Sequence, residues 1–362
     1  MKKRIDKVGR SVLIIFTIIT ILLFIVELNT KRDVKIHYYE EKIKAGQIFQ
    51  EMMRRVKIEK EKRGIVIDLI NDPNQTGIIG QQYTPITFQR SDLSASLTST
   101  NPNFVAVFIE MFKKLKLKSG DTIAVGLDGS FPAVNMALYS ALRVMDIKPI
   151  IITNVSSAMW GANDPNFTWL DIEHILYQDK LTSHKSVAAS LGGEDDLGRG
   201  FSPQARQFLL DAVSRNQVEL ISSENLETNI KKHLDVYFKC KKIKAFINVG
   251  KSVANIGENQ SSFINGIIRR LPSKYNRQSV IAEMLSKNIP VINITDVNKI
   301  AMRYGLPIAP VPLPPLGKGK LFIEKRFSPI VALIFAIIIL ICLFFVIRYD
   351  LEYYLSKKKE NK

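Results

Sequence analysis

The sequence has few of the residues that hold metals or form cross-links. It contains two cysteines, Cys240 and Cys342, and four histidines in 362 residues. These numbers exclude a disulfide framework and a four-cysteine zinc module, and no H-x-x-x-H spacing of the metalloprotease type occurs. A P-loop needs a glycine five residues before Gly250-Lys251, where Ala245 stands. No motif identifies a cofactor.

Basic residues are in excess over acidic ones. Lys and Arg number 51 against 34 Asp and Glu, a net charge of +17, and hydrophobic residues make up 46% of the chain. Such a chain is not a disordered polyelectrolyte. A basic domain attracts acidic polymers and anionic headgroups. The alternative is a general enrichment in lysine without a binding role.

Two long hydrophobic runs lie near the chain ends. Residues 11–26 contain no charge and follow a basic segment, and the next residues lack a small-x-small cleavage pattern, which predicts an uncleaved signal anchor. Residues 328–347 are also uncharged and predict a transmembrane helix. The alternative for either run is a buried core helix.

Two spans place both tails on one side of the membrane and the large domain on the other. The basic residues flanking the first span are balanced, so they do not decide the orientation. Long domains cross largely regardless of their charge, and the short basic tails are expected to stay in the cytoplasm. We therefore expect a two-span cell-membrane protein with an extracytoplasmic domain, a position that also disfavours nucleic acid as a partner.

Short apolar runs alternate with helical patterns between the spans. A strand or the start of a strand region is expected at 64–70, a buried strand at 122–127, the next strand at 149–153, and further β-like runs at 186–190, 218–221, 243–249 and 290–294. This alternation predicts an α/β fold, with a mainly parallel, Rossmann-like sheet and helices on both faces. The expected organisation is a tail (1–10), a span (11–28), a helical stalk (29–63), the α/β domain (64–304), a Pro-rich connector (305–327), a span (328–347) and a tail (348–362).

A strand-to-helix turn around Ser130 is the first candidate site. Its N–H groups and the positive end of the following helix favour an anionic ligand. Ser130 is also a candidate nucleophile, with Asp164 as a candidate acidic partner, although the G-x-S-x-G spacing is not met. The alternative is a purely structural turn.

Two further loops follow predicted strands, where ligands bind in open α/β sheets. One contains Trp160, and the other contains Glu194 and Asp195, which are weak candidates for a divalent cation because the D-x-D-x-D-G spacing is absent. Structural turns are the alternative for both loops. The candidate ligand-binding residues of the three loops are Gly126, Asp128, Gly129, Ser130, Ser156, Ser157, Trp160, Asn163, Asp164, Ser190, Gly192 and Gly193.

The same loops resemble a known family. The chain resembles the bacterial poly-gamma-glutamate system proteins in both hydrophobic ends and in most of the domain between them. The similar stretches are 71–80 (NDPNQTGIIG), 99–104 (STNPNF), 125–133 (VGLDGSFPA), 157–165 (SAMWGANDP), 168–171 (TWLD), 187–193 (VAASLGG) and 304–307 (YGLP). The resemblance implies a part in making, exporting or retaining an anionic γ-linked glutamate polymer, beside the synthase subunits. It supplies no catalytic residues.

The sequence therefore leaves three alternative functions. The first is an accessory protein that binds carboxylates of the polymer. The second is a hydrolase or transferase acting on γ-glutamyl or cell-wall bonds through Ser130. The third is a scaffold that gathers the synthase subunits through its spans.

Overall fold

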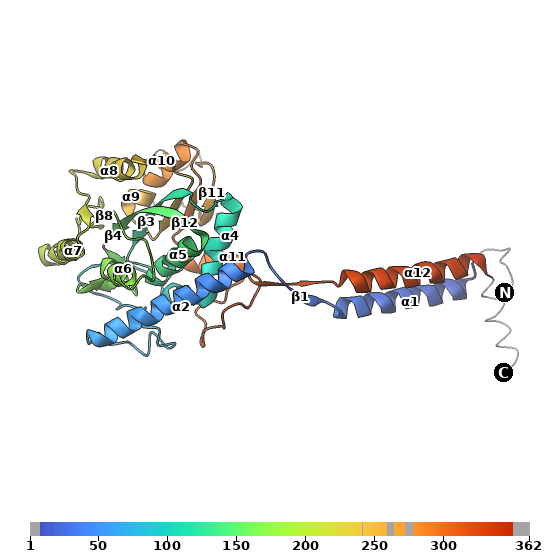
Figure 1. Cartoon of the computed structure of the whole chain (residues 1–362). Coiled ribbons are helices and arrows are strands. Elements are labelled where there is room, and N and C mark those ends of the chain that lie inside the picture. The colour runs from blue at the N-terminus through green and yellow to red at the C-terminus, as the bar shows by residue number, and fades with distance from the viewer. Residues whose placement is uncertain (1–7, 241, 259–263, 272–277, 350–362) are drawn as a thin grey trace. The chain divides into compact units, whose positions relative to one another are not determined.

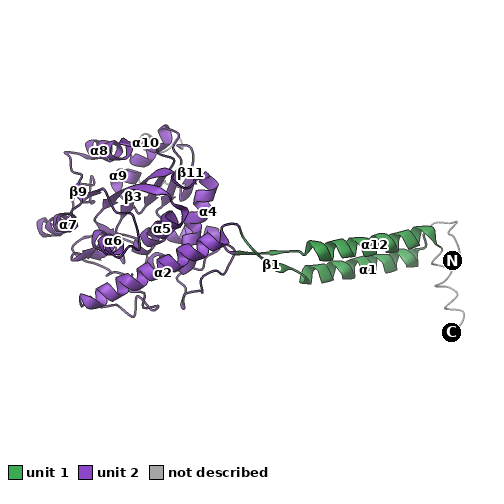
Figure 2. Ribbon diagram, in the orientation of Figure 1, with its two compact units in different colours: residues 1–36, 323–362 green, residues 37–322 purple. Residues whose placement is uncertain are grey.

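The computed structural model describes residues 8–240, 242–258, 264–271 and 278–349. The chain divides into two compact units, residues 1–36 with 323–362 and residues 37–322 (Figure 2). Most of the two expected cytoplasmic tails (1–7 and 350–362) lies outside the described residues.

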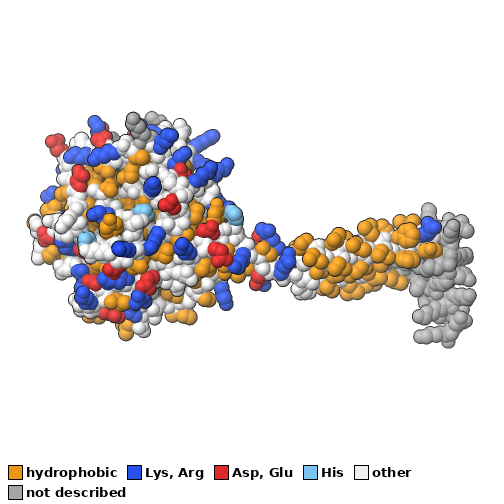
Figure 3. Space-filling model, in the orientation of Figure 1, with side chains coloured by type: hydrophobic (Ala, Val, Ile, Leu, Met, Phe, Trp, Pro, Cys, Tyr) orange, Lys and Arg blue, Asp and Glu red, His pale blue; other side chains and the backbone are white. Residues whose placement is uncertain are grey.

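The first unit contains the two hydrophobic helices, α1 (Arg10–Asn29) and α12 (Pro329–Arg348), which contact each other. Two short strands, β1 (Arg32–Lys35) and β13 (Ile323–Arg326), pair antiparallel beside them. Both helices are long and apolar enough to cross a membrane, and only 6% of each apolar window is buried. Figure 3 shows hydrophobic side chains covering them. They are therefore not core helices of this unit, and they are compatible with two membrane spans.

The second unit is built on a seven-stranded sheet in the order β11–β12–β10–β3–β4–β8–β9 (Figure 1). All neighbouring strands are parallel except β11, which runs antiparallel to β12. The expectation of an α/β fold with a mainly parallel sheet is confirmed. The strands are β3 (Thr122–Asp128), β4 (Lys148–Asn154), β8 (Ala188–Ser190), β9 (Glu219–Leu220), β10 (Phe246–Val249), β11 (Gly266–Ile268) and β12 (Val291–Ile294).

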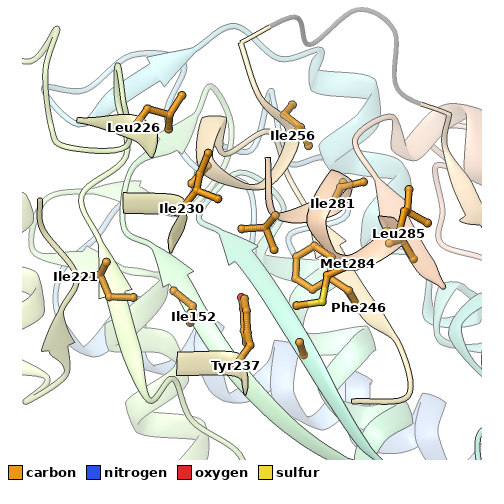
Figure 4. Packing of buried hydrophobic residues seen from close by; sticks show 14 of the residues in the cluster. Ile152, Ile221, Leu226, Ile230, Tyr237, Phe246, Ile256, Ile281, Met284 and Leu285 are labelled. Atoms are coloured by element: carbon orange, nitrogen blue, oxygen red, sulfur yellow. The ribbon is translucent and has the colours of Figure 1, made fainter. Parts of the chain in front are cut away.

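Helices and short strand pairs surround the sheet. A cluster of buried side chains, including Tyr237, Phe246 and Met284, packs α8, α9 and α10 on one face (Figure 4). Helices α2, α4 and α5 pack on one another. The short strand pairs are β2 (Thr87–Gln89) with β5 (Ser157–Ala158), and β6 (Asn163–Asp164) with β7 (Phe167–Thr168). The helices are α2 (Tyr39–Lys62), α3 (Leu93–Ser99), η1 (Pro102–Phe104), α4 (Val105–Leu115), α5 (Pro132–Met145), α6 (Trp169–Gln178), α7 (Pro203–Arg215), α8 (Leu226–Phe238), α9 (Val253–Ile256), α10 (Val280–Ser286) and α11 (Val297–Tyr304).

The strand expected at 64–70 is wrong. These residues form turns after α2, because Gly64 has a positive φ of 69° and the Asp68 carboxylate accepts hydrogen bonds from the N–H groups of Ile70 and Asn71. A side chain that bonds its own neighbouring backbone competes with strand pairing.

The two segments expected to link the domain to the membrane belong to the α/β unit over most of their length. Helix α2 packs against α4 and α5 through a buried stripe that includes Phe49 and Met52. The proline-rich segment lies on the same unit, since Asn74 and Asn103 donate hydrogen bonds to the carbonyls of Pro310 and Pro315. The links outside this unit are short, residues 30–36 and 323–328.

Candidate functional site

The order of the strands reverses next to β3. The chain runs outward from β3 through β4, β8 and β9, and then returns to place β10 on the other side of β3. In open parallel sheets, ligands bind at the carboxyl ends of the two strands that flank such a reversal. Asp128 ends β3, and Gly250 and Lys251 follow β10, so these residues define the candidate site.

Asp128 is the central group of this site. Its Oδ1 accepts a hydrogen bond from the Ser130 N–H at 2.8 Å, and its Oδ2 accepts one from the Lys251 N–H at 2.7 Å. The residue is 4% exposed, and burial raises the pKa of its carboxyl to about 6. The Ser130 N–H, which the sequence offered to an anionic ligand, is therefore already satisfied by an internal carboxylate, and so is the Lys251 N–H.

The three predicted turns meet beside Asp128. The Ser130 hydroxyl accepts a hydrogen bond from the Ala158 N–H at 3.0 Å, which joins the first turn to the second. The third turn approaches closely at Gly192, where an added Cβ would overlap the side chains of Ser156 and Asn154. A volume of only about 10 Å³ remains, enough for roughly one water. This inner pocket is lined by Phe88, Gln89, Asp128, Ser130, Asn154, Ser156, Ser157, Gly193, Lys251, Ser252 and Val253.

A buried polar network holds the third turn in place. Asp196 is fully buried and accepts hydrogen bonds from Asn154 and Asn229, each at 3.0 Å. His233 Nε2 lies 3.1 Å from the second oxygen of Asp196. Because a buried carboxylate needs such partners, the network ties residues 191–200 to β4 and α8.

An open crevice of about 740 Å³ extends from the inner pocket across the ends of β10 and β12. Arg90, Lys251 and Lys299 supply its positive charges. Its two carboxylates are already in use, since Asp92 caps α3 through the Ser94 N–H and Asp296 caps α11 and pairs with Lys299 at 3.1 Å. Neither Arg90 nor Lys251 forms a side-chain hydrogen bond or ion pair with another described residue.

Three of the predicted residues lie elsewhere. Trp160, Asn163 and Asp164 line a separate groove of about 760 Å³, together with Lys60. The Asn163 amide is used internally, accepting from the Gln81 N–H and donating to the Gln81 carbonyl. Asp164 and Ser130 line different pockets, so the structure does not bring these two catalytic candidates together.

Among the residues that the structure describes, Lys60 is the only cation that lines this groove, and it is buried. Its Nζ donates to the Ile79 carbonyl at 3.3 Å. Burial lowers the pKa of Lys60 to about 8, while Asp72 and Asp164 favour its charged form. Its positive charge is therefore offset from within the protein.

The remaining predicted glycines and Ser190 lie in the strands and turns that pack around the site. Gly126 lies in β3 against the Asn255 side chain, and Gly129 lies against Ser157. Gly192 and Gly193 have positive φ values of 76° and 74°, which glycine adopts without strain. Ser190 ends β8 and is fully buried.

The weak metal candidates do not converge with other ligands. Asp195 pairs with Arg199, and the Glu194 backbone bonds to the same residue. In the part of the chain that the structure describes, no group of three or more His, Cys, Asp or Glu side chains is placed to hold a metal ion.

None of the three crevice cations, Arg90, Lys251 and Lys299, was among the sequence candidates. Lys251 has a detectable signal, because its Gly-Lys-Ser turn follows a strand, although the glycine spacing of a P-loop is missing. Arg90 lies between β2 and α3, and no pattern marks it. Comparison with family models, curated proteins and solved structures finds no match for this chain.

Proposed function

We propose that this protein is a two-span membrane protein whose α/β unit binds an anionic polymer, poly-gamma-glutamate, in the crevice at the ends of β3, β10 and β12. In this proposal both tails lie in the cytoplasm and the α/β unit lies outside. The protein acts as an accessory component in synthesis, export or retention of the polymer, next to the synthase subunits.

The observation that carries the proposal is that Arg90 and Lys251 line an open crevice of about 740 Å³ and form no ion pair or side-chain hydrogen bond with a described residue. The Asp128 carboxylate offsets part of the Lys251 charge through space, whereas Arg90 has no such neighbour in the described part of the chain. Cationic side chains without internal partners bind carboxylates at little cost in lost contacts. Residues 37–322 contain 36 Lys and Arg against 27 Asp and Glu, a net charge of +9, which raises the local concentration of a polyanion.

The test is binding of purified poly-gamma-glutamate to the full chain in detergent or nanodiscs. The double variant Arg90→Gln, Lys251→Gln is expected to bind about tenfold more weakly than the unmodified protein at low salt, and the difference is expected to shrink as salt screens the charges.

The matched control is Lys180→Gln, Lys231→Gln, which removes the same charge at two exposed positions outside the crevice. This control is expected to change the affinity less than twofold. Equal losses in both double variants would show that only net charge matters and would reject the crevice as the binding site.

A second candidate is a hydrolase or transferase acting on γ-glutamyl or cell-wall bonds. It is favoured by the pKa of Asp128, which at about 6 lies near the range suited to proton transfer, beside the Ser130 hydroxyl. Polymer of unchanged length and yield from a strain carrying Ser130→Ala would remove Ser130 as a nucleophile.

A further inference from the structure

The two ends of the α/β unit, His37 and Phe322, are held together. Lys42, which is fully buried, donates to Glu110 Oε1 of α4 at 2.6 Å and to the Leu321 carbonyl at 2.7 Å. The rings of Tyr39 and Phe322 meet edge to face, with centroids 6.1 Å apart. Both links to the hydrophobic helices therefore start from one place on this unit.

An exposed basic surface surrounds this place. The Nζ atom of Lys113 lies 5.9 Å from the ring centroid of Tyr38, and the Nζ atom of Lys114 lies 4.9 Å from the ring centroid of Tyr304. Lys320 passes next to Gly305, the neighbour of Tyr304. Arg269 donates to the Lys114 carbonyl at 2.8 Å. We call these residues the exit patch: the exposed cations Lys113, Lys114, Arg269 and Lys320, with Tyr38 and Tyr304.

Nearby carboxylates offset only part of this charge. Glu110 is engaged by Lys42, and Glu40 and Glu41 lie in the first turn of α2, where the positive end of the helix favours their ionised form. The four cations of the exit patch outnumber these two remaining carboxylates. Lysines with tyrosine rings are also the side chains enriched at membrane–water interfaces, because they combine an apolar body with a polar tip.

The links limit how far the exit patch can move from a membrane. They contain seven residues (30–36) and six residues (323–328), and a residue spans at most about 3.5 Å, so a link reaches at most about 25 Å. The links are themselves basic, with Lys31, Arg32, Lys35, Lys325 and Arg326 against Asp33 and Glu324.

We infer that the exit patch binds the phosphate headgroups of anionic phospholipids and so orients the α/β unit on the membrane surface. The inference rests on the proposed two-span anchoring. It does not involve Arg90 or Lys251, so the crevice remains available for the polymer.

The test uses the full chain in nanodiscs of phosphatidylcholine alone or mixed with phosphatidylglycerol. The acetylation rate of each lysine is followed by mass spectrometry. Lys113, Lys114 and Lys320 are expected to react about fivefold more slowly in the anionic discs, with recovery at high salt. Lys185 is the internal control, because it also lies near a tyrosine ring (Tyr177, 5.5 Å) but outside the exit patch.

Three outcomes would overturn the inference: equal rates of the patch lysines in both discs, equal protection of Lys185, or protection by soluble poly-gamma-glutamate in phosphatidylcholine discs as large as that by anionic lipid. Alkali-resistant association with the discs tests the anchoring separately, and the Arg90 and Lys251 variants test the crevice separately. Failure of the exit patch is thus distinguishable from failure of the proposed function.

Discussion

Two open hollows formed by described residues of the α/β unit have nearly equal volumes, about 740 Å³ in the crevice and about 760 Å³ in the groove beside Lys60. They differ in how their charges are compensated. In the crevice the carboxylates of Asp92 and Asp296 are used as helix caps, and Arg90 and Lys251 form no ion pair with a described residue. Asp128 offsets part of the Lys251 charge, so Arg90 is the less compensated of the two cations. In the groove the single lysine is buried, and two aspartates offset its charge.

The difference shows that volume does not identify an anion site. A ligand carboxylate gains most binding free energy next to a cation that has no carboxylate of the protein beside it. It gains little next to a cation whose charge a protein carboxylate already offsets.

The largest effect is expected at Gly161, which lines the groove and lies against Ser157 and Ser130 of the inner pocket. An added Cβ would overlap the Ser157 hydroxyl and the Gly129 carbonyl oxygen. Gly161→Ala should lower the free energy of unfolding by about 3 kcal/mol, because a close backbone approach cannot relax. Gly120→Ala is the control, since its Cβ meets open space and only the positive φ of 81° is strained, and it should cost about 1 kcal/mol. Equal costs measured by urea unfolding would contradict the close-approach explanation.

The next effect concerns the pH dependence of stability at Lys60. Its folded pKa of about 8 lies below the ordinary value of 10.5, so the unfolded state binds more protons between these values. The free energy of unfolding should therefore rise with pH in this window, by about 2 kcal/mol near pH 10, relative to Lys60→Met. Parallel stability curves for the two proteins over this range would show that Lys60 is not buried as described.

A smaller effect is expected at Asp128. Its raised pKa of about 6 means that the folded state keeps a proton between about pH 4 and 6 after the unfolded state has lost it, so its contribution to stability falls as pH rises through this window. Protonation also removes a negative charge next to Lys251. Binding of the polymer should strengthen about threefold from pH 7 to pH 5.5.

The control for this prediction is Asp128→Asn, which stays uncharged. At constant ionic strength, the affinity of this variant for the polymer should be the same at pH 7 and pH 5.5. A threefold gain that persists in Asp128→Asn would assign the pH effect to another group.

The smallest effect is expected for polymer binding by Lys60→Met. Because the Lys60 charge is offset by Asp72 and Asp164, its removal should change the affinity less than twofold. A loss as large as that of the crevice double variant would reverse the comparison and make the groove the anion site.

Long apolar patterns were predictable from the sequence. The two hydrophobic helices, and the strands that became β3, β4, β10 and β12, were each expected within a few residues. Their periodicity and length leave few alternatives, because each must remove apolar side chains from water.

The candidate site was predictable only in part. The Ser130 and Ser156 turns and Gly193 were expected at strand ends and do line one pocket, but Asp164 was expected with them and lies in the groove. Residues 64–70 carry a strand-like sequence and form turns, because Asp68 bonds to the neighbouring backbone. Such outcomes depend on which segment lies next to which, and no local pattern contains that information.

Two hydrophobic helices, a basic chain and a mainly parallel sheet follow from local sequence patterns, since hydrophobic burial and periodicity act locally along the chain. The position at which the order of the strands reverses depends instead on how distant segments pack. That reversal places Lys251 beside Asp128, although 122 residues separate them along the chain, and Arg90 joins them from a segment without regular pattern. Contacts of this range follow from packing, which is why the charges of the crevice appear only in the folded unit.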